Sequence, residues 1–395
     1  MSENKKNLST HLISEKNTIL PSKFLFKVKE EPEDNDGENR NPQKRIGFIS
    51  TGLLIVKSMI GSGILNVPLI FKTLGILPSI ILSLIYSFIT LLSIHFLIRS
   101  HEITNTYSYS FFSKIIFGIK GSIFTKICII LMTGTVSCVY LKIFGNLMHT
   151  IIIIFINDNG SLFFNNQFLL IIVGILLLPF MFKKDISLIL KFAFLGIIAI
   201  GILVLSIVIL FLYKKSKEEI KFNSSMLYTI ESKKINNNYF SYFLCIASFY
   251  SAYSFQFNTF PIFLPLEPRN RITMIKSTSI GCIISSLIYI IVGILGYLLY
   301  NENIEDSLLI YIEKDLILYF QNNKIMFLVL LFCILSFFIN TIISLILNFF
   351  VTRSHLCNII MIIKKNMSNI KKKRNSEEEI GDELEDYNDK SNYSR

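Results

Sequence analysis

The chain has 395 residues, a formal net charge of +11 and an unusual balance of apolar and charged side chains. Apolar residues make up 52% and charged residues 17%, whereas soluble chains average roughly 45–50% and 25%. Many of the charges lie in residues 1–45 and 364–395, so the middle is more apolar still. This composition excludes a soluble enzyme, a disulfide scaffold and a disordered chain.

Basic residues outnumber acidic ones by 39 to 28. They flank the apolar runs, which is typical of cytoplasmic loops of membrane proteins and not of a nucleic-acid-binding face. The six cysteines include no CxxC pair, so neither a disulfide framework nor a metal site is expected. The apolar runs contain no cluster of His, Asp and Glu of the kind that would indicate an enzyme. We expect the lipid bilayer as a partner, and neither nucleic acid nor a cofactor.

Eight apolar runs follow one another along the chain, with lengths that suit helices crossing a bilayer core of about 30 Å. They cover residues 46–71, 74–98, 123–156, 168–182, 186–213, 239–266, 272–300 and 326–351. The sequence therefore predicts an all-α polytopic membrane protein whose transmembrane domain extends over residues 46–363. The polar segment 1–45 and the charged segment 364–395 are predicted to be disordered tails.

Basic residues also orient the runs. They concentrate in every second connection, from Lys44-Arg45 before the first run to Lys364-Lys365 after the eighth. The positive-inside rule places these connections, and both termini, in the cytoplasm. The loop 214–238 is an exception, because it falls outside and carries six lysines. The plasma membrane and a vacuolar or lysosomal membrane both remain open, and the oligomeric state is not predicted.

Two of the runs contain residues that interrupt a helix. The first holds Gly61-Ser62-Gly63 and Pro68, and the sixth is rich in polar side chains before Pro261. Backbone groups freed in a membrane cannot face lipid and must face protein or a wet cavity. Two interrupted helices five spans apart are typical of inverted-repeat transporters with a binding site at the midplane. Close helix packing and interhelical hydrogen bonds are the alternative explanations.

Lys57 lies one turn before Gly61, inside the first apolar run. A charge within a membrane is costly and is therefore a functional hypothesis by default. The ammonium could replace a bound cation, or it could titrate. The alternative is that the side chain extends to the cytoplasmic interface.

The segment Gly61–Pro68, its continuation to Ile76 and the segment Ala252–Ile262 resemble the amino acid/auxin permease family. Lys57 falls where proton-coupled members of that family carry a lysine and sodium-coupled members an asparagine. Ser344 aligns with a hydroxyl position used for sodium in the sodium-coupled relatives, and Thr341 lies nearby. Two departures are Gln256, in place of a histidine, and Pro265, in place of a glutamate.

This resemblance covers roughly residues 47–355, and it implies two inverted repeats of about five spans. The apolar pattern stops after the eighth run, so the second repeat is expected to be incomplete and the chain shortened. The implied function is secondary active transport of amino acids, proton-coupled or ion-independent, with sodium coupling less favoured because Lys57 is charged. The alternative is a non-transporting sensor or a partner subunit of a full-length transporter.

The resemblance and the interruptions together assign roles to particular residues. Backbone N–H groups at Gly61, Ser62 and Gly63 are expected to bind the substrate carboxylate. Ser251, Ser254 and neighbouring carbonyls of the sixth run are expected to bind the amino group, and Asn258 of the same run is also expected to bind the substrate. The residues assigned to ion coupling are Lys57, Thr341 and Ser344.

Overall fold

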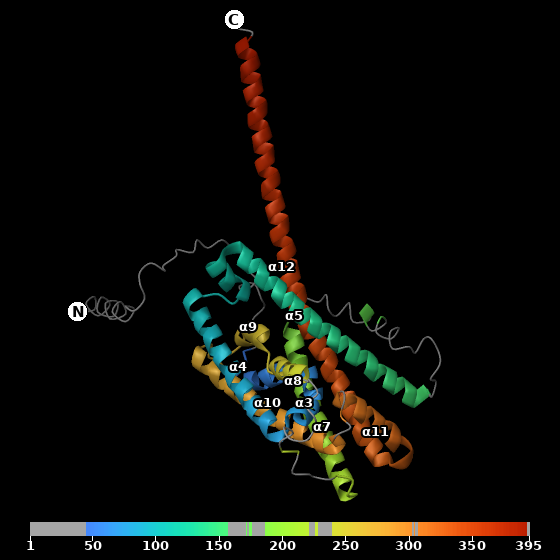
Figure 1. Ribbon diagram of the computed structural model, residues 1–395. Helices are drawn as coiled ribbons and strands as arrows, with labels where there is room; N and C mark the ends of the chain where they lie inside the picture. Colours follow the sequence, from blue (N-terminus) through green and yellow to red (C-terminus); the bar gives the residue numbers. More distant parts are fainter. Residues whose placement is uncertain are drawn as a thin grey trace, which may run out of the picture. The chain divides into compact units, whose positions relative to one another are not determined.

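The computed structural model describes residues 45–156, 171, 174–175, 186–220, 226–227, 239–301, 304 and 307–392. Within these residues the regular elements are helices (Figure 1). They are α2 (Phe48–Met59), η2 (Ser62–Leu65), α3 (Val67–Leu74), α4 (Ile76–Thr104), α5 (Tyr109–Ile156), α7 (Ile186–Ser216), α8 (Tyr239–Ala252), η6 (Gln256–Asn258), α9 (Thr259–Phe263), α10 (Arg271–Tyr300), α11 (Leu308–Asn322) and α12 (Lys324–Asn392).

Five of the described helices are long and apolar enough to cross a membrane. These candidate spans are Ile76–Thr104, Tyr109–Ile152, Phe194–Ser216, Arg271–Tyr300 and Lys324–Met361. They confirm the prediction of an all-α membrane protein. The predicted run 168–182 lies almost wholly outside the described residues, as do residues 1–44 of the predicted N-terminal tail.

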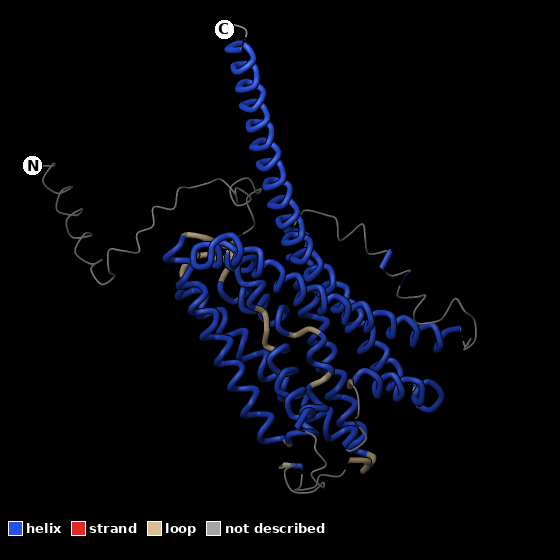
Figure 2. Tube along the Cα trace, turned by 45° about the horizontal axis from the view of Figure 1, so that its top comes forward, coloured by secondary structure: helices blue, strands red, loops and turns tan. Residues whose placement is uncertain are grey.

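The first and sixth predicted runs are each divided into shorter helices, with loops between the pieces (Figure 2). In the first run α2 ends at Met59, and Ile60 and Gly61 leave the helical conformation before α3 begins. Pro68 stands in the first turn of α3, where its missing N–H costs nothing. In the sixth run α8 ends at Ala252 and α9 begins at Thr259. The helices are thus interrupted where glycine, proline and polar residues predict it.

Helices α10 and α7 both contact α2, the first piece of the first broken segment. Helix α10 packs against α2, α3 and α4, while α12 packs against α5 and α7. Small residues allow the α2–α10 contact to be close, because a Cβ atom on Gly281 would lie 2.5 Å from Ile55 Cγ2. Large apolar side chains on α4 and α5 are exposed, including Phe88, Phe96 and Phe124. Such faces suit contact with lipid.

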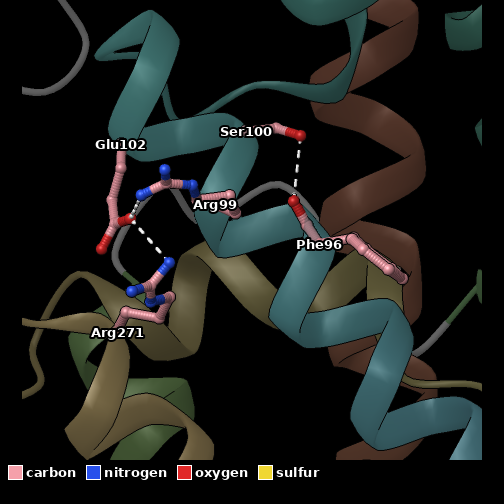
Figure 3. Close-up of polar contacts among 5 residues, drawn as sticks. All are labelled: Phe96, Arg99, Ser100, Glu102 and Arg271. Atoms are coloured by element: carbon pink, nitrogen blue, oxygen red, sulfur yellow. Dashed lines mark hydrogen bonds and ion pairs between the residues drawn. The ribbon is translucent and has the colours of Figure 1, made fainter. Parts of the chain in front are cut away.

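Charged residues that the sequence assigns to one side of the membrane meet at one end of the helices. Glu102, near the end of α4, pairs with Arg99 at 3.2 Å and with Arg271, at the start of α10, at 3.3 Å (Figure 3). Arg45 pairs with Glu267 at 2.6 Å. These contacts fit a chain that crosses the membrane back and forth, and the assignment of this end to the cytoplasm stays a prediction.

At the opposite end, α11 adds an element that the sequence analysis does not predict. Its Asp315 pairs with Lys214 of α7 at 2.8 Å and accepts a hydrogen bond from the Tyr300 hydroxyl at 2.7 Å. Lys72 of α3 donates a hydrogen bond to the backbone oxygen of Ile304 at 2.7 Å. The acidic residues of this stretch are typical of a loop, but the structure shows a short helix. One face of that helix buries Leu308, Ile312 and Leu316, while Ile317 and Leu318 remain exposed.

Helix α12 continues through Asn392, over a segment for which composition predicts disorder. Lys, Arg and Glu are good helix formers, which accounts for the helical conformation there. Helix α5 begins at Tyr109, earlier than the apolar run suggests, and bends at Gly118, whose φ of 69° is non-helical. The division into a transmembrane domain and two tails stays a prediction.

Candidate functional site

The two interrupted helices meet at a cavity of about 60 Å³, between them and helices α5 and α12. This volume has room for several water-sized groups. All the candidate residues of the sequence analysis line the cavity except Thr341, which is buried and donates a hydrogen bond to the Phe337 carbonyl at 2.8 Å. Those in the lining are Lys57, Gly61, Ser62, Gly63, Ser251, Ser254, Asn258 and Ser344.

Tyr140 of α5 reaches the first interruption. Its hydroxyl oxygen accepts a hydrogen bond from the Ser62 backbone N–H at 3.2 Å. A Cβ atom on Gly61 would lie only 1.9 Å from the same oxygen, so the approach requires glycine at this position. The hydroxyl keeps its own proton for another acceptor, because oxygen can accept one hydrogen bond and donate another. One backbone donor of the break therefore already has a polar partner at the cavity wall.

The two interruptions also touch each other. A Cβ atom on Gly63 would lie 3.0 Å from the Cβ atom of Ala252 at the end of α8. The hydroxyl of Tyr289, on α10, lies 2.8 Å from the Met59 carbonyl oxygen and 2.9 Å from the Ala252 carbonyl oxygen. Two backbone carbonyls, one at the end of each interrupted helix, thus lie within hydrogen-bonding distance of the same phenol hydroxyl.

Hydroxyl groups of other helices donate to two further carbonyls of the second interruption. The Tyr109 hydroxyl donates to the Gln256 carbonyl, and the Thr90 hydroxyl donates to the Tyr253 carbonyl at 3.3 Å. The Tyr253 hydroxyl, fully buried, hydrogen-bonds to Ser83 at 2.6 Å and to Ser286 at 2.9 Å. These bonds are needed because a buried carbonyl without a donor costs about 1–3 kcal/mol.

Lys57 extends into the cavity wall. Its side chain is 2% exposed, and its ammonium donates a hydrogen bond to the Ser344 hydroxyl of α12 at 2.6 Å. The methylene chain passes Gly196 of α7, where an added Cβ atom would lie 2.3 Å from Lys57 Cε. The side chain therefore runs between α7 and α12, and not outward to the interface.

The cavity wall combines a positive charge with a buried amide oxygen. Among the described residues that line it, Lys57 is the only charged side chain. Asn348 donates to the Ser344 carbonyl at 2.8 Å. In the described part of the chain, the side-chain oxygen of Asn348 is buried without a hydrogen-bond partner, as is that of Asn340, two turns earlier on α12 and outside the cavity lining. The site thus offers a cation, backbone donors and acceptor oxygens within one small space.

Several residues of this site escape the sequence analysis. Tyr140 and Tyr289 lie within apolar runs and belong to no local motif that would mark them. Asn340 and Asn348 do carry a signal, because each lies four residues from Ser344, which the resemblance already assigned to the site, and this spacing places all three on one face of a helix. A search for polar residues at helical spacing inside apolar runs would have found this stripe.

Membrane-spanning helices with two interruptions around a small polar cavity define a class of membrane proteins that bind a small solute between helices. The family described as transmembrane amino acid transporter protein matches residues 44–381, and the chain belongs to this family. It is a family of transporters and not of enzymes.

Individual relatives carry names of the same kind. Amino acid transporter AVT6C of Arabidopsis thaliana is 24% identical over 304 residues, which are 73% of this chain and 65% of that protein. Putative amino acid transporter AAT1 of Plasmodium falciparum is 28% identical over 298 residues, 71% of this chain and 46% of that protein. Amino acid transporter AVT6E of Arabidopsis thaliana is 24% identical over 273 residues, which are 66% of this chain and 54% of that protein. The chain thus spans roughly half to two thirds of the length of these relatives.

Proposed function

We propose that this protein is a secondary active transporter of small amino acids, with neutral amino acids as its preferred substrates. The observation that carries the proposal is the meeting of two helix interruptions at one cavity, where the first contributes backbone donors and the second contributes acceptors. An amino acid is a zwitterion that needs both kinds of partner. Membership of a transporter family and the names of the relatives support the same function.

The carboxylate is assigned to the first interruption. The N–H groups of Gly61, Ser62 and Gly63 bind it, as backbone donors at the start of a half-helix bind anions elsewhere. In the empty site the Gly61 N–H donates to the Met59 carbonyl and the Ser62 N–H to the Tyr140 hydroxyl, so these two groups exchange their partners for the carboxylate. The Tyr140 hydroxyl, which accepts from Ser62, turns its own proton toward the carboxylate. The Lys57 ammonium, held by Ser344, adds a favourable charge nearby.

The amino group is assigned to the second interruption. Ser251, Ser254 and Asn258 line the cavity there, together with Ala252. Hydroxyl, amide and backbone carbonyl oxygens are acceptors suited to an ammonium group. The small volume of the cavity favours substrates that carry little beyond the atoms common to all amino acids.

Alternating access follows from the contacts at the two ends of the helices. We assign the helices to two inverted repeats, in which α2–α3 and α8–α9 are the corresponding interrupted pairs. In this proposal the Arg45–Glu267 pair is the closing contact at one end and the Lys214–Asp315 pair is the closing contact at the other. Opening the cavity toward either side requires one of these contacts to separate while the other holds.

Lys57 determines the coupling in this scheme. Its ammonium occupies a position beside Ser344 where a bound cation would meet strong repulsion. Transport is therefore driven by protons or is independent of ions, and sodium coupling is disfavoured. Both termini are assigned to the cytoplasm, because the basic residues fall in alternate connections.

The test is uptake into proteoliposomes that contain the full chain. Alanine uptake is measured with an imposed pH gradient, with a sodium gradient and with neither, for the wild type, Lys57→Ala and the control Lys276→Ala, an exposed lysine on α10. We expect uptake without sodium, its loss in Lys57→Ala and its retention in the control. Sodium-driven uptake that persists in Lys57→Ala contradicts the coupling. Thermal stabilisation by alanine without any uptake favours a non-transporting sensor or partner subunit instead.

A further inference from the structure

The hydroxyl of Tyr289 has one proton and two carbonyl acceptors. Met59 O lies at 2.8 Å and Ala252 O at 2.9 Å, and the tyrosine side chain is fully buried. A phenol donates one hydrogen bond at full strength, so the two carbonyls compete for it. Both acceptors belong to residues that line the cavity, one at the end of α2 and one at the end of α8.

The two acceptors are not equivalent. The Met59 carbonyl also accepts a hydrogen bond from the Gly61 N–H at 2.9 Å, within the first interruption. The Ala252 carbonyl lies where the helix has ended, and among the described residues Tyr289 is the donor that reaches it. When the phenol turns toward Met59, Ala252 is therefore left without a donor, whereas Met59 keeps one when the phenol turns toward Ala252.

We propose that Tyr289 is a positioning residue. Its hydroxyl changes its hydrogen-bond acceptor from one interrupted helix to the other as the amino group of a substrate binds and leaves. In the empty site the phenol donates to the Ala252 carbonyl. A bound ammonium takes over that carbonyl, and the phenol then donates to Met59. Substrate binding in the second interruption thereby strengthens a contact to the first. This inference rests on the proposed function and adds the residue that links the two halves of the site.

Replacement of the hydroxyl changes the empty site more than the occupied one. In Tyr289→Phe the Ala252 carbonyl has no donor until an ammonium arrives. Binding of an amino acid then restores a buried hydrogen bond, and the expected gain in affinity is about tenfold. The gain requires an ammonium, so a ligand that has only the carboxylate does not show it. Turnover falls, because the substrate leaves an unsatisfied carbonyl when it dissociates.

The experiment compares alanine with propionate, which lacks the amino group, by thermal stabilisation of the purified full chain in lipid nanodiscs. Tyr297→Phe is the control, because Tyr297 is a buried tyrosine two turns further along α10 that does not line the cavity. We expect the affinity for alanine, relative to propionate, to rise about tenfold in Tyr289→Phe and to stay unchanged in Tyr297→Phe. An altered fold alone would change both ligands together.

Three results overturn the inference. Equal ratios in Tyr289→Phe and the wild type remove the role of the shared proton, while the proposed function stands if the wild type binds alanine. A gain for propionate as large as that for alanine assigns the effect to the carboxylate. Failure of alanine to bind the wild type removes the proposed function and this inference together.

A measurement on the wild type covers the case in which Tyr289→Phe does not fold. Ethylamine, which carries an ammonium and no carboxylate, has to compete with alanine if the Ala252 carbonyl accepts the amino group. Absence of competition at concentrations where alanine saturates the site overturns the assignment.

Discussion

The two helix interruptions differ in how their residues fill space. The first, around Gly61 and Gly63, carries little side-chain volume, and other residues approach its backbone directly. The second contains Tyr253 and Phe255, whose rings are 1% and 0% exposed and are anchored among neighbouring helices. The conformation of the first interruption therefore depends on residues of other helices that contact its backbone. That of the second depends on its own aromatic side chains, which pack between neighbouring helices.

This difference extends to the backbone. At the first interruption an N–H group reaches the cavity wall, where Tyr140 accepts from Ser62. At the second, side-chain hydroxyls from other helices cover the carbonyls of Tyr253 and Gln256. Substitutions at the first interruption should thus act through steric overlap at the cavity. Those at the second should act through the loss of single hydrogen bonds, with smaller consequences.

The largest effect on uptake is expected from Gly61→Ala. The new Cβ atom would lie 1.9 Å from the Tyr140 hydroxyl oxygen, an overlap that backbone or ring must move to relieve. Overpacking of this kind costs about 1–3 kcal/mol and displaces the N–H groups of the break. We expect alanine uptake to fall to background and the thermal midpoint to drop by several degrees.

Two further variants locate the cause of that loss. Gly134→Ala, in α5, is the matched control, because a Cβ atom there meets nothing within 4 Å. Removal of the hydroxyl in the double variant Gly61→Ala/Tyr140→Phe leaves a nearest ring carbon at 3.2 Å and should restore part of the thermal stability. If the double variant is no more stable than Gly61→Ala, the close contact with Tyr140 is not what requires glycine.

A moderate effect is expected from Gly196→Ala, which tests the side chain beside the first interruption. The added Cβ atom would lie 2.3 Å from Cε of Lys57, a flexible chain that can move aside. The ammonium then shifts away from Ser344, and alanine uptake should fall several-fold without loss of folded protein. Gly201→Ala on the same helix meets nothing within 4 Å and should gain about 0.5–1 kcal/mol of helix stability with normal uptake. Equal uptake in the two variants would contradict a role for the position of Lys57.

The interruptions themselves were predictable from sequence, because glycine, proline and clustered polar residues break a helix whatever its neighbours are. The cavity lining near Gly61–Gly63 and Ser251–Asn258 followed from the same reasoning. The sequence pattern also assigned Ser344 and Thr341 to one site by resemblance, yet only Ser344 meets Lys57. The two residues are three positions apart, so their side chains leave the helix in directions that differ by about 60°, and this difference separates the hydroxyl that faces the cavity from the one that does not.

The partners of the interruptions were not predictable. Tyr140 and Tyr289 lie on helices other than the two interrupted ones, and their positions depend on how α5 and α10 pack. Helix α11 was missed for a related reason. Acidic residues such as Asp315 and Glu313 are typical of loops in a sequence. Only the packed structure shows that they are buried against basic or hydroxyl groups.

A smaller effect is expected from Tyr109→Phe at the second interruption. The substitution removes the hydroxyl that donates to the Gln256 carbonyl and leaves the ring packed against Phe260. Loss of one such bond costs about 1 kcal/mol, so uptake should fall a fewfold and the thermal midpoint only slightly. Tyr107→Phe, half-exposed in the preceding loop, is the control and should behave as the wild type. A loss as severe as that of Gly61→Ala would remove the contrast between the two interruptions.

The smallest effect on uptake is expected outside both interruptions, at Glu313 of α11, which is not among the candidate spans. Burial raises the pKa of this carboxyl from 4.5 to about 7, with an opposing contribution from a hydrogen bond with Thr150. The folded state then holds a proton that the unfolded state has lost, so stability falls as pH rises from about 4.5 to 7. A shift of this size corresponds to at most about 3 kcal/mol.

Glu313→Gln removes that dependence, because glutamine stays neutral. The variant should therefore exceed the wild type in thermal midpoint by a larger margin at pH 8 than at pH 5, while alanine uptake is unchanged at pH 5, where both side chains are neutral. An equal margin at the two pH values would show that the Glu313 carboxyl does not carry the burial cost. A loss of uptake at pH 5 would extend the functional region beyond the two interruptions and weaken the comparison between them.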